Sequence, residues 1–403
     1  MSLIQQALES ADETRAIEFG HGALARTGGL FRSVFPDATA LVVADENTFA
    51  AAGAEVLASL SAAGVVLAAE PFILPGTPTL YADYDNTGLV RERLAALPGA
   101  VACSIASGTL NDVTKLASGE LGRPYMNVCT AASVDGFSSY GASISVDGFK
   151  LTRDCPAPAG LVADLAVMAA APTRLTSTGY GDLIEKIPAG ADWILADELG
   201  VERIDAHVWD LVQGRLRNAL ARPEALVAGD EEAVAALAEG NLLSGLAVQA
   251  MKSSRPASGA GHQFSHTWEM EGHGLDWEPP LSHGFKVGVG TVASLALWEE
   301  AMRLDLAELD VDEAHERWRR RHGGGRGRPR RRRGAVPGRR RRPDQGSAAR
   351  EDPRRVHQGL AGEARRGRGP PRAAPPDPGE VGRHPRPGCR PARRSRGGRR
   401  HAA

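Results

Sequence analysis

Three histidines and one aspartate form the most chemically suggestive pattern in this sequence. His262 and His266 stand four residues apart, which on a helix places both imidazoles on one face. His283 follows a Pro-Pro break, and Asp182 follows a Gly-Tyr-Gly stretch where we expect a helix to begin. One carboxylate with two or three imidazoles is a ligand set for a catalytic divalent metal that keeps a position open for substrate. The pattern predicts a metal-dependent enzyme.

A second candidate site is the stretch SGTLNDVTK at 107–115, where a predicted strand meets a helix. Small residues there let backbone amides approach a pyrophosphate, whose charge is favoured at a helix N-terminus. An ordinary capped turn gives the same pattern, and the stretch is not the GxGxxG dinucleotide fingerprint. Asp45, at the end of an earlier predicted strand, is placed to bind a ribose, although it would as often cap a helix. The hydroxyl-rich stretch at 130–139 is either a site loop or an ordinary polar loop.

Two kinds of domain are expected to position these residues. Residues 1–170 alternate short apolar runs with helical patterns, which predicts an α/β domain whose parallel sheet has helices on both faces. Residues 171–316 have helical texture and predict an all-α domain, with the active site in the cleft between the two. The expected strands are 38–44, 64–69 and 100–105, and the expected helices include 50–62, 92–97, 206–220 and 231–246.

Residues 317–403 differ in composition from the rest of the chain. They hold 29 arginines, no lysine and six acidic residues, whereas the first 316 residues hold 19 basic and 43 acidic ones. With Leu360 as the only leucine, this tail has little to bury, so we expect disorder. Arginine, glycine, proline and alanine have GC-rich codons, so we interpret the tail as a frameshift product. A genuine disordered tail and a nucleic-acid-binding arm are the alternatives.

The cysteines and apolar runs bear on location. Four cysteines without a CxxC pair or regular spacing are typical of a reduced, intracellular protein. The N-terminus has no basic region followed by an apolar run, and no stretch approaches the roughly 18 apolar residues of a membrane span. We therefore expect a cytoplasmic protein without a membrane partner.

Several motifs, taken in chain order, resemble the metal-dependent polyol dehydrogenases of the iron-type alcohol dehydrogenase and dehydroquinate synthase superfamily, and within it the sn-glycerol-1-phosphate dehydrogenases. The resemblance runs from about residue 15 to 316. Its motifs are SGTLNDVTK at 107–115, TAASVDGFSS at 130–139, GYGD at 179–182, SSRPASG at 253–259, HQFSHTWE at 262–269 and HGFKVG at 283–288. The family continues beyond Trp318 with further helices, so we expect the helical domain to be incomplete here.

The resemblance implies a role for each matching residue. Asp182, His262 and His283 would bind the metal, His266 would face the substrate, and Asp135 would hold a substrate hydroxyl, so Asp135 and His266 are the expected catalytic residues. The 253–259 loop is a candidate phosphate cradle. The expected cofactor-binding residues come from the end of the earlier strand, from the helix start and from the 130–139 stretch. They are Asp45, Gly108, Thr109, Leu110, Asn111, Asp112, Thr130, Ala131, Ala132, Ser133 and Ser139.

The implied activity is hydride transfer at C2 between NAD or NADP and a small phosphorylated polyol, interconverting dihydroxyacetone phosphate and sn-glycerol 1-phosphate. One divalent metal, Zn, Ni or Fe, would serve as a Lewis acid. A homo-oligomer is expected, and nucleic acid is not expected as a partner. A glycerol or other small-polyol dehydrogenase of the same superfamily is the first alternative. Nucleic-acid binding through the arginine-rich tail is the alternative from a different class.

Overall fold

The computed structural model describes residues 2–322 of the 403-residue chain. Residues 317–322 of the expected tail belong to the last helix, α14 (Val311–His322). The predictions of disorder, of a frameshift and of a nucleic-acid arm otherwise concern residues 323–403, which lie outside the described residues. The α/β part and the helical part together form one compact unit that extends to Arg317.

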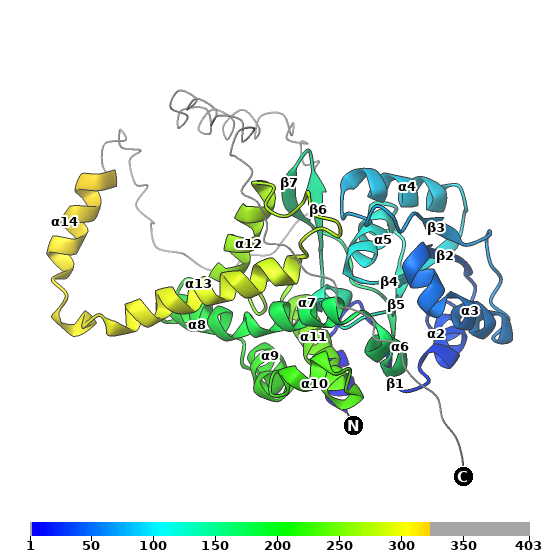
Figure 1. Ribbon diagram of the computed structural model, residues 1–403, viewed down its shortest axis with the longest axis horizontal. Coiled ribbons are helices and arrows are strands. Elements are labelled where there is room, and N and C mark those ends of the chain that lie inside the picture. The colour runs from blue at the N-terminus through cyan, green and yellow to red at the C-terminus, as the bar shows by residue number, and fades with distance from the viewer. Residues whose placement is uncertain (1, 323–403) are drawn as a thin grey trace, which may run out of the picture. The chain divides into compact units, whose positions relative to one another are not determined.

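The first part of the chain builds a six-stranded, all-parallel sheet with the strand order β1-β8-β5-β4-β2-β3 (Figure 1). The strands β4, β5 and β8 are buried along their whole length, as expected where helices cover both faces. The predicted α/β fold class is therefore confirmed. The six strands are β1 (Ala16–Gly20), β2 (Thr39–Asp45), β3 (Phe72–Leu74), β4 (Ala100–Ala106), β5 (Tyr125–Cys129) and β8 (Gly160–Asp164).

Alternating residues of β2 show how the two faces are covered. Val42 packs into a cluster with helices α2 (Thr27–Val34) and α3 (Glu46–Ala62). Its neighbour Val43 packs into a second cluster with α4 (Tyr84–Ala95) and α5 (Gly108–Glu120). Successive side chains of a strand point to opposite faces, so a fully apolar strand requires helices on both.

The prediction of a strand at 64–69 is wrong. Only Leu67 pairs there, in an isolated bridge to Ala40, and the edge strand is β3, further along the chain. Val66 is 64% exposed, so this apolar run lies at the surface. An apolar run alone does not reveal where an edge segment leaves the sheet.

A separate two-stranded hairpin, β6 (Ala142–Val146) and β7 (Phe149–Arg153), projects from the α/β part. Its turn is Asp147-Gly148, and both residues have positive φ, 51° and 80°. Two-residue hairpin turns need such angles, and Asp-Gly is among the sequences that adopt them most readily. The hairpin brings Lys150 of β7 to helix α12, where its Nζ lies 3.1 Å from Oε1 of Glu269.

The second part of the chain is helical, as predicted. Leu183, Leu216, Leu237 and Leu242 share one core cluster that also holds residues of the N-terminal helix α1 (Leu3–Leu8). The helices are α6 (Leu165–Ala170), α7 (Thr173–Ile184), α8 (Lys186–Glu198), α9 (Ala206–Ala219), α10 (Pro223–Val227), α11 (Glu231–Met251), α12 (Ala260–Met270) and α13 (His283–Arg303), followed by α14; short 3-10 turns lie at Leu24–Arg26, Asp135–Phe137 and Leu306–Glu308.

Helix α11 is the one helix among the described residues that is long and apolar enough to cross a membrane. Its most apolar window is 67% buried inside the protein. Residues such as Leu237, Leu242 and Leu246 contribute to the core cluster of the helical part. The apolar character of α11 is accounted for by its position in the core.

Lys115 of α5 is a structural residue. Its fully buried Nζ donates hydrogen bonds to the carbonyl oxygens of Gly136, Ser139 and Gly141 at 2.7, 3.1 and 3.0 Å. We expect Lys115→Met to destabilise the fold by about 3 kcal/mol, because it leaves several buried carbonyls without a donor. Urea unfolding followed by circular dichroism measures this. Lys252→Met is the control, since Lys252 is an exposed partner of Glu13 and should change stability by less than about 1 kcal/mol.

Candidate metal and cofactor site

Asp182, His262 and His283 meet at one point of the helical part. They come from α7, α12 and the first residue of α13, and their potential ligand atoms all lie within 4.8 Å of one another. His262 Nε2 lies 3.3 Å from Asp182 Oδ1, and His283 Nδ1 is buried without a hydrogen-bond partner. One carboxylate and two imidazoles with an unpaired ring nitrogen form a donor set that fits a divalent metal.

The prediction that Asp182 begins a helix is wrong, because Asp182 lies near the C-terminal end of α7. The glycines before it serve close packing. A Cβ on Gly179 would lie 1.8 Å from the carbonyl oxygen of Ala132, and one on Gly181 would lie 2.4 Å from that of Gly284. These glycines let α7 approach both the 130–139 loop and helix α13, which brings Asp182 to the two histidines.

Glu185 orients His262. Its Oε2 lies 2.9 Å from Nδ1 of His262, and the carboxylate is fully buried. A carboxylate on the second ring nitrogen fixes the tautomer of a metal-binding histidine and increases its basicity. Nε2 is then the nitrogen that faces Asp182 and the metal position.

Lys186 supplies a buried positive charge beside the ligands. Its Nζ lies 3.0 Å from Asp135 Oδ2 and 3.2 Å from Asp182 Oδ1. Asp135 also accepts a hydrogen bond from the Ser244 hydroxyl at 2.9 Å, and its backbone amide donates to Asp182 Oδ2 at 3.0 Å. The expected catalytic residue Asp135 is thus tied directly to the metal-ligand carboxylate.

The pKa values of these groups reflect burial and their neighbours. Burial lowers the pKa of His262, but hydrogen bonds to Asp182 and Glu185 outweigh it and raise the pKa to about 9. Burial opposes ionisation of Asp182, yet the Lys186 charge and His262 hold its pKa well below the usual value. Burial and the charge of His262 lower the pKa of His283 to about 3. These shifts favour an ionised Asp182 and a neutral His283, the states in which both bind a metal, whereas His262 must lose a proton when a metal binds.

His266 lies one turn beyond His262 on α12, as expected from the spacing. Its ring stacks on that of His283 with centroids 5.5 Å apart, and its Nδ1 is buried without a hydrogen-bond partner. Burial and the His262 charge lower the pKa of His266 to about 4, so the ring is neutral. Its ligand atoms also approach those of Glu269 and His283. His266 therefore lies directly beside the triad, between His283 and Glu269.

The start of α5 fits a cofactor phosphate better through its backbone than through its side chains. Ser107 precedes the helix without a side-chain cap, which leaves the first amides free of that partner. Ser133, whose Oγ is buried without a hydrogen-bond partner, lies beside Gly108: a Cβ there would come within 3.9 Å of that Oγ. Unpaired donors at a helix start suit a bound pyrophosphate.

The other predicted cofactor residues are mostly engaged in the fold. Leu110 is buried in the core, Asn111 binds Tyr125 and Gly136, and Asp112 accepts the amide of Ser143. Asp45 caps α3 by accepting the amides of Asn47 and Thr48 with Oδ1, so the capping interpretation describes its main contacts. Thr109 lies in the first turn of α5, and the remaining ones, Thr130, Ala131, Ala132 and Ser139, are buried in the loop beside it.

The 253–259 loop, expected as a phosphate cradle, makes polar contacts with carboxylates of the protein. The amide of Gly259 donates to Glu185, and the following amide donates to Asp192, at 3.2 and 2.7 Å. Arg255 pairs with Glu202 at 2.7 Å. The loop thus directs its donors and its cation toward carboxylates of the protein.

This chain is similar to proteins of a known family. A family model described as iron-containing alcohol dehydrogenase matches residues 18–172. The glycerol-1-phosphate dehydrogenase (NAD(P)+) of Bacillus velezensis is 36% identical over 271 residues, which are 67% of this chain and 68% of that relative. This chain belongs to the iron-containing alcohol dehydrogenase family. The protein of the same name from Halalkalibacterium halodurans is 36% identical over 264 residues, 65% of each chain. The chain thus spans about two thirds of the length of these curated relatives.

A solved structure has a similar fold. Glycerol dehydrogenase from Schizosaccharomyces pombe superposes with a TM-score of 0.56 at 20% identity, covering 70% of this chain and 71% of that one. At this identity the comparison supports the fold of the family member and leaves its substrate open.

Four polar residues of the site in this iron-containing alcohol dehydrogenase were missed from sequence. They are Glu185, Lys186, Lys150 and Tyr81, whose hydroxyl donates to Glu269 at 2.6 Å. A usable signal was the rarity of lysine: the chain has five lysines and 43 arginines. In a sequence whose ordinary cation is arginine, four of the five lysines, at positions 115, 150, 186 and 286, lie at buried or nearly buried positions that suit a compact, point-like charge.

Proposed function

We propose that this chain is an NAD(P)-dependent sn-glycerol-1-phosphate dehydrogenase that interconverts dihydroxyacetone phosphate and sn-glycerol 1-phosphate. The convergence of Asp182, His262 and His283, with His266 stacked on His283 beside them, carries the proposal. The relatives with the same name at 36% identity support the choice of substrate. The choice between NAD and NADP, the identity of the metal and a homo-oligomeric, cytoplasmic state stay predictions.

Asp182, His262 and His283 would hold the metal, and their donor set fits it. When bound, a divalent metal acts as a Lewis acid that polarises the C2 oxygen of the substrate. Glu185 keeps His262 oriented, and Lys186 keeps Asp182 ionised and fixed. The protein thus prepares a rigid site before substrate arrives.

The remaining residues bind and orient the reactants. The carboxylate of Asp135 can accept a hydrogen bond from a substrate hydroxyl, because it lies at the site and is held by Lys186 and Ser244. The neutral imidazole of His266 can accept a hydrogen bond at one ring nitrogen and donate one at the other, which suits proton movement to or from the substrate. The amides at the start of α5 and the Ser133 hydroxyl would position the cofactor for hydride transfer at C2.

The test of the activity compares two substrates. The protein, supplied with Zn or Ni, should oxidise NADH or NADPH with dihydroxyacetone phosphate, and kcat/KM should be about 100-fold higher than with dihydroxyacetone. Binding energy from the remote phosphate orients the reacting carbonyl. The rate of absorbance loss at the nicotinamide band measures both reactions.

The product supplies the stereochemical control. An enzyme specific for sn-glycerol 3-phosphate should leave the product of this reaction unconsumed. Comparable kcat/KM values for the two substrates would contradict the proposal and indicate the glycerol dehydrogenase alternative.

A further inference from the structure

Four of the five lysines of this chain surround the site, at positions 115, 150, 186 and 286. Two of them have complete sets of protein partners. Lys115 donates to three carbonyl oxygens, and Lys186 lies between the carboxylates of Asp135 and Asp182. The ammonium groups of Lys115 and Lys186 are therefore already paired with groups of the protein. Lys150 and Lys286 differ from them.

Lys286 is a buried cation without a partner. It lies on α13, one turn from His283, and the residue is only 2% exposed. Among residues 2–322, no hydrogen bond or ion pair to its Nζ is present. Burial lowers its pKa, and the Glu269 charge opposes that effect. An ammonium group on a largely buried side chain that has no protein partner favours an anion as its neighbour.

Lys150 lies on the facing side of Glu269, at the tip of the β6–β7 hairpin. Oε1 of Glu269 accepts hydrogen bonds from the Tyr81 hydroxyl and interacts with Lys150 Nζ at 3.1 Å, while Oε2 is buried without a hydrogen-bond partner. Burial would raise the pKa of Glu269, but Lys150 and Tyr81 lower it to about 2. The charges of Lys150 and Lys286 both favour the ionised form of this carboxylate, so the cluster holds two ammonium groups and one carboxylate and has a net positive charge.

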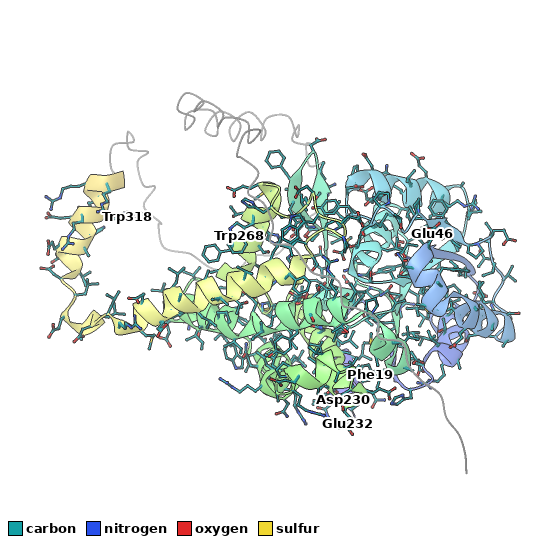
Figure 2. The ribbon with its side chains drawn as sticks, in the orientation of Figure 1. Phe19, Glu46, Asp230, Glu232, Trp268 and Trp318 are labelled. Carbon is teal, nitrogen blue, oxygen red and sulfur yellow. The ribbon has the colours of Figure 1, made fainter. Side chains whose placement is uncertain are left out.

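The cluster is adjacent to the reacting position. Glu269 lies on the same face of α12 as His262 and His266, and its ligand atoms are within 4.8 Å of those of His266 and His283. Trp268 marks this helix in Figure 2. A substrate whose carbonyl lies at the metal triad would extend a neighbouring substituent toward Lys150 and Lys286.

A cavity of about 380 Å³ opens beside this cluster, with Tyr81, Ser145, Lys150 and Glu269 in its wall. The rest of its wall includes three aspartates, Asp83, Asp85 and Asp147. These acids repel an anion, so a dianionic group is favoured only at the end of the cavity that holds Lys150.

We propose that Lys286 and Lys150 form the subsite that binds the phosphate of the substrate, with Glu269 holding Lys150 in place. This inference rests on the proposed function, because it assigns residues to the phosphate that distinguishes the substrate from dihydroxyacetone. A phosphate dianion has enough acceptor oxygens for both ammonium groups, and charge-assisted hydrogen bonds of this kind are strong. The subsite joins the hairpin of the α/β part to helix α13 of the helical part.

The experiment compares Lys286→Met and Lys150→Gln with the unaltered chain. In each variant the ratio of kcat/KM for dihydroxyacetone phosphate to that for dihydroxyacetone should fall about 10- to 100-fold, the loss expected for one charge-assisted contact. The ratio separates phosphate binding from general damage, since misfolding lowers both rates together. Lys252→Met, on the exposed Glu13 pair, is the matched control and should keep the ratio.

Binding of inorganic phosphate, followed by phosphorus NMR or calorimetry, tests the subsite without turnover. The unaltered chain and Lys252→Met should bind inorganic phosphate, and the two site variants should bind it at least about tenfold more weakly. If neither substrate is turned over but this pattern holds, the proposed activity fails while the subsite stands. Unchanged phosphate affinity in both site variants, or an unchanged substrate ratio in an active enzyme, would overturn the subsite.

Discussion

His262→Ala should abolish both metal retention and turnover. In the proposed site His262 is one of three protein ligands, and its Nε2 lies 3.3 Å from Asp182 Oδ1. Removing one of three ligands leaves a site too weak to retain the metal through dialysis. It also leaves Glu185 buried without its imidazole partner. Elemental analysis after dialysis, together with the rate of NADH oxidation, measures the two losses.

His266→Ala is the matched variant, one helical turn further along α12. It should retain the metal, because the ligand triad is complete without it, and it should turn over at least about 100-fold more slowly, within the usual contribution of a proton-transferring group. The comparison also addresses the second set of close groups, His266, Glu269 and His283. If His266→Ala loses metal while His262→Ala keeps it, the metal lies in that second set.

Lys186→Met should destabilise the metal-free protein by about 3–5 kcal/mol. The fully buried ammonium lies between Asp135 and Asp182, so its removal leaves two carboxylates in the interior without their shared counter-charge. Adding Zn or Ni should restore part of the lost stability, because a metal bound to Asp182 supplies positive charge at the same place. Thermal and urea unfolding, each with chelator and with metal, measure the effect.

Lys252→Met serves again as the surface control, and its loss of stability should stay below about 1 kcal/mol. A Lys186→Met protein as stable as the control in the presence of chelator would show that the two aspartates do not depend on this charge. A variant that is destabilised equally with and without metal would show that the metal does not bind at Asp182.

The fold class and the shared face of His262 and His266 could be predicted from sequence because both depend on local periodicity. His262 and His266 fall on one face of α12 as their spacing required, and the apolar strands form the parallel sheet. The strand expected at 64–69 failed, because the position of a sheet edge depends on where the chain turns. The prediction that a helix starts at Asp182 was wrong because Gly179 and Gly181 do not interrupt the helix. They allow close contacts between segments distant in the chain.

The residues that contact the candidate site residues could not be predicted from spacing in the sequence. Lys150 and Glu269 are distant in the chain and meet only because the hairpin approaches α12. Asn111 and Asp112 matched a cofactor motif, yet the structure shows their side chains holding the neighbouring loop. Sequence motifs identify which residues belong to the site, while the division between binding and support depends on tertiary contacts.

The backbone contacts of α7 have a consequence for mutational tolerance. Gly179 faces the carbonyl oxygen of Ala132, Gly181 faces that of Gly284, and a Cβ on Gly284 would lie 2.0 Å from the carbonyl oxygen of Thr178. Any single codon change at these three positions that alters the amino acid adds a side chain where main chain already lies. In a saturation library selected for metal binding, only glycine should be recovered there, whereas Gly29, with open space around it, should accept alanine. The position of the Asp182 carboxylate thus depends on three residues that must lack a side chain.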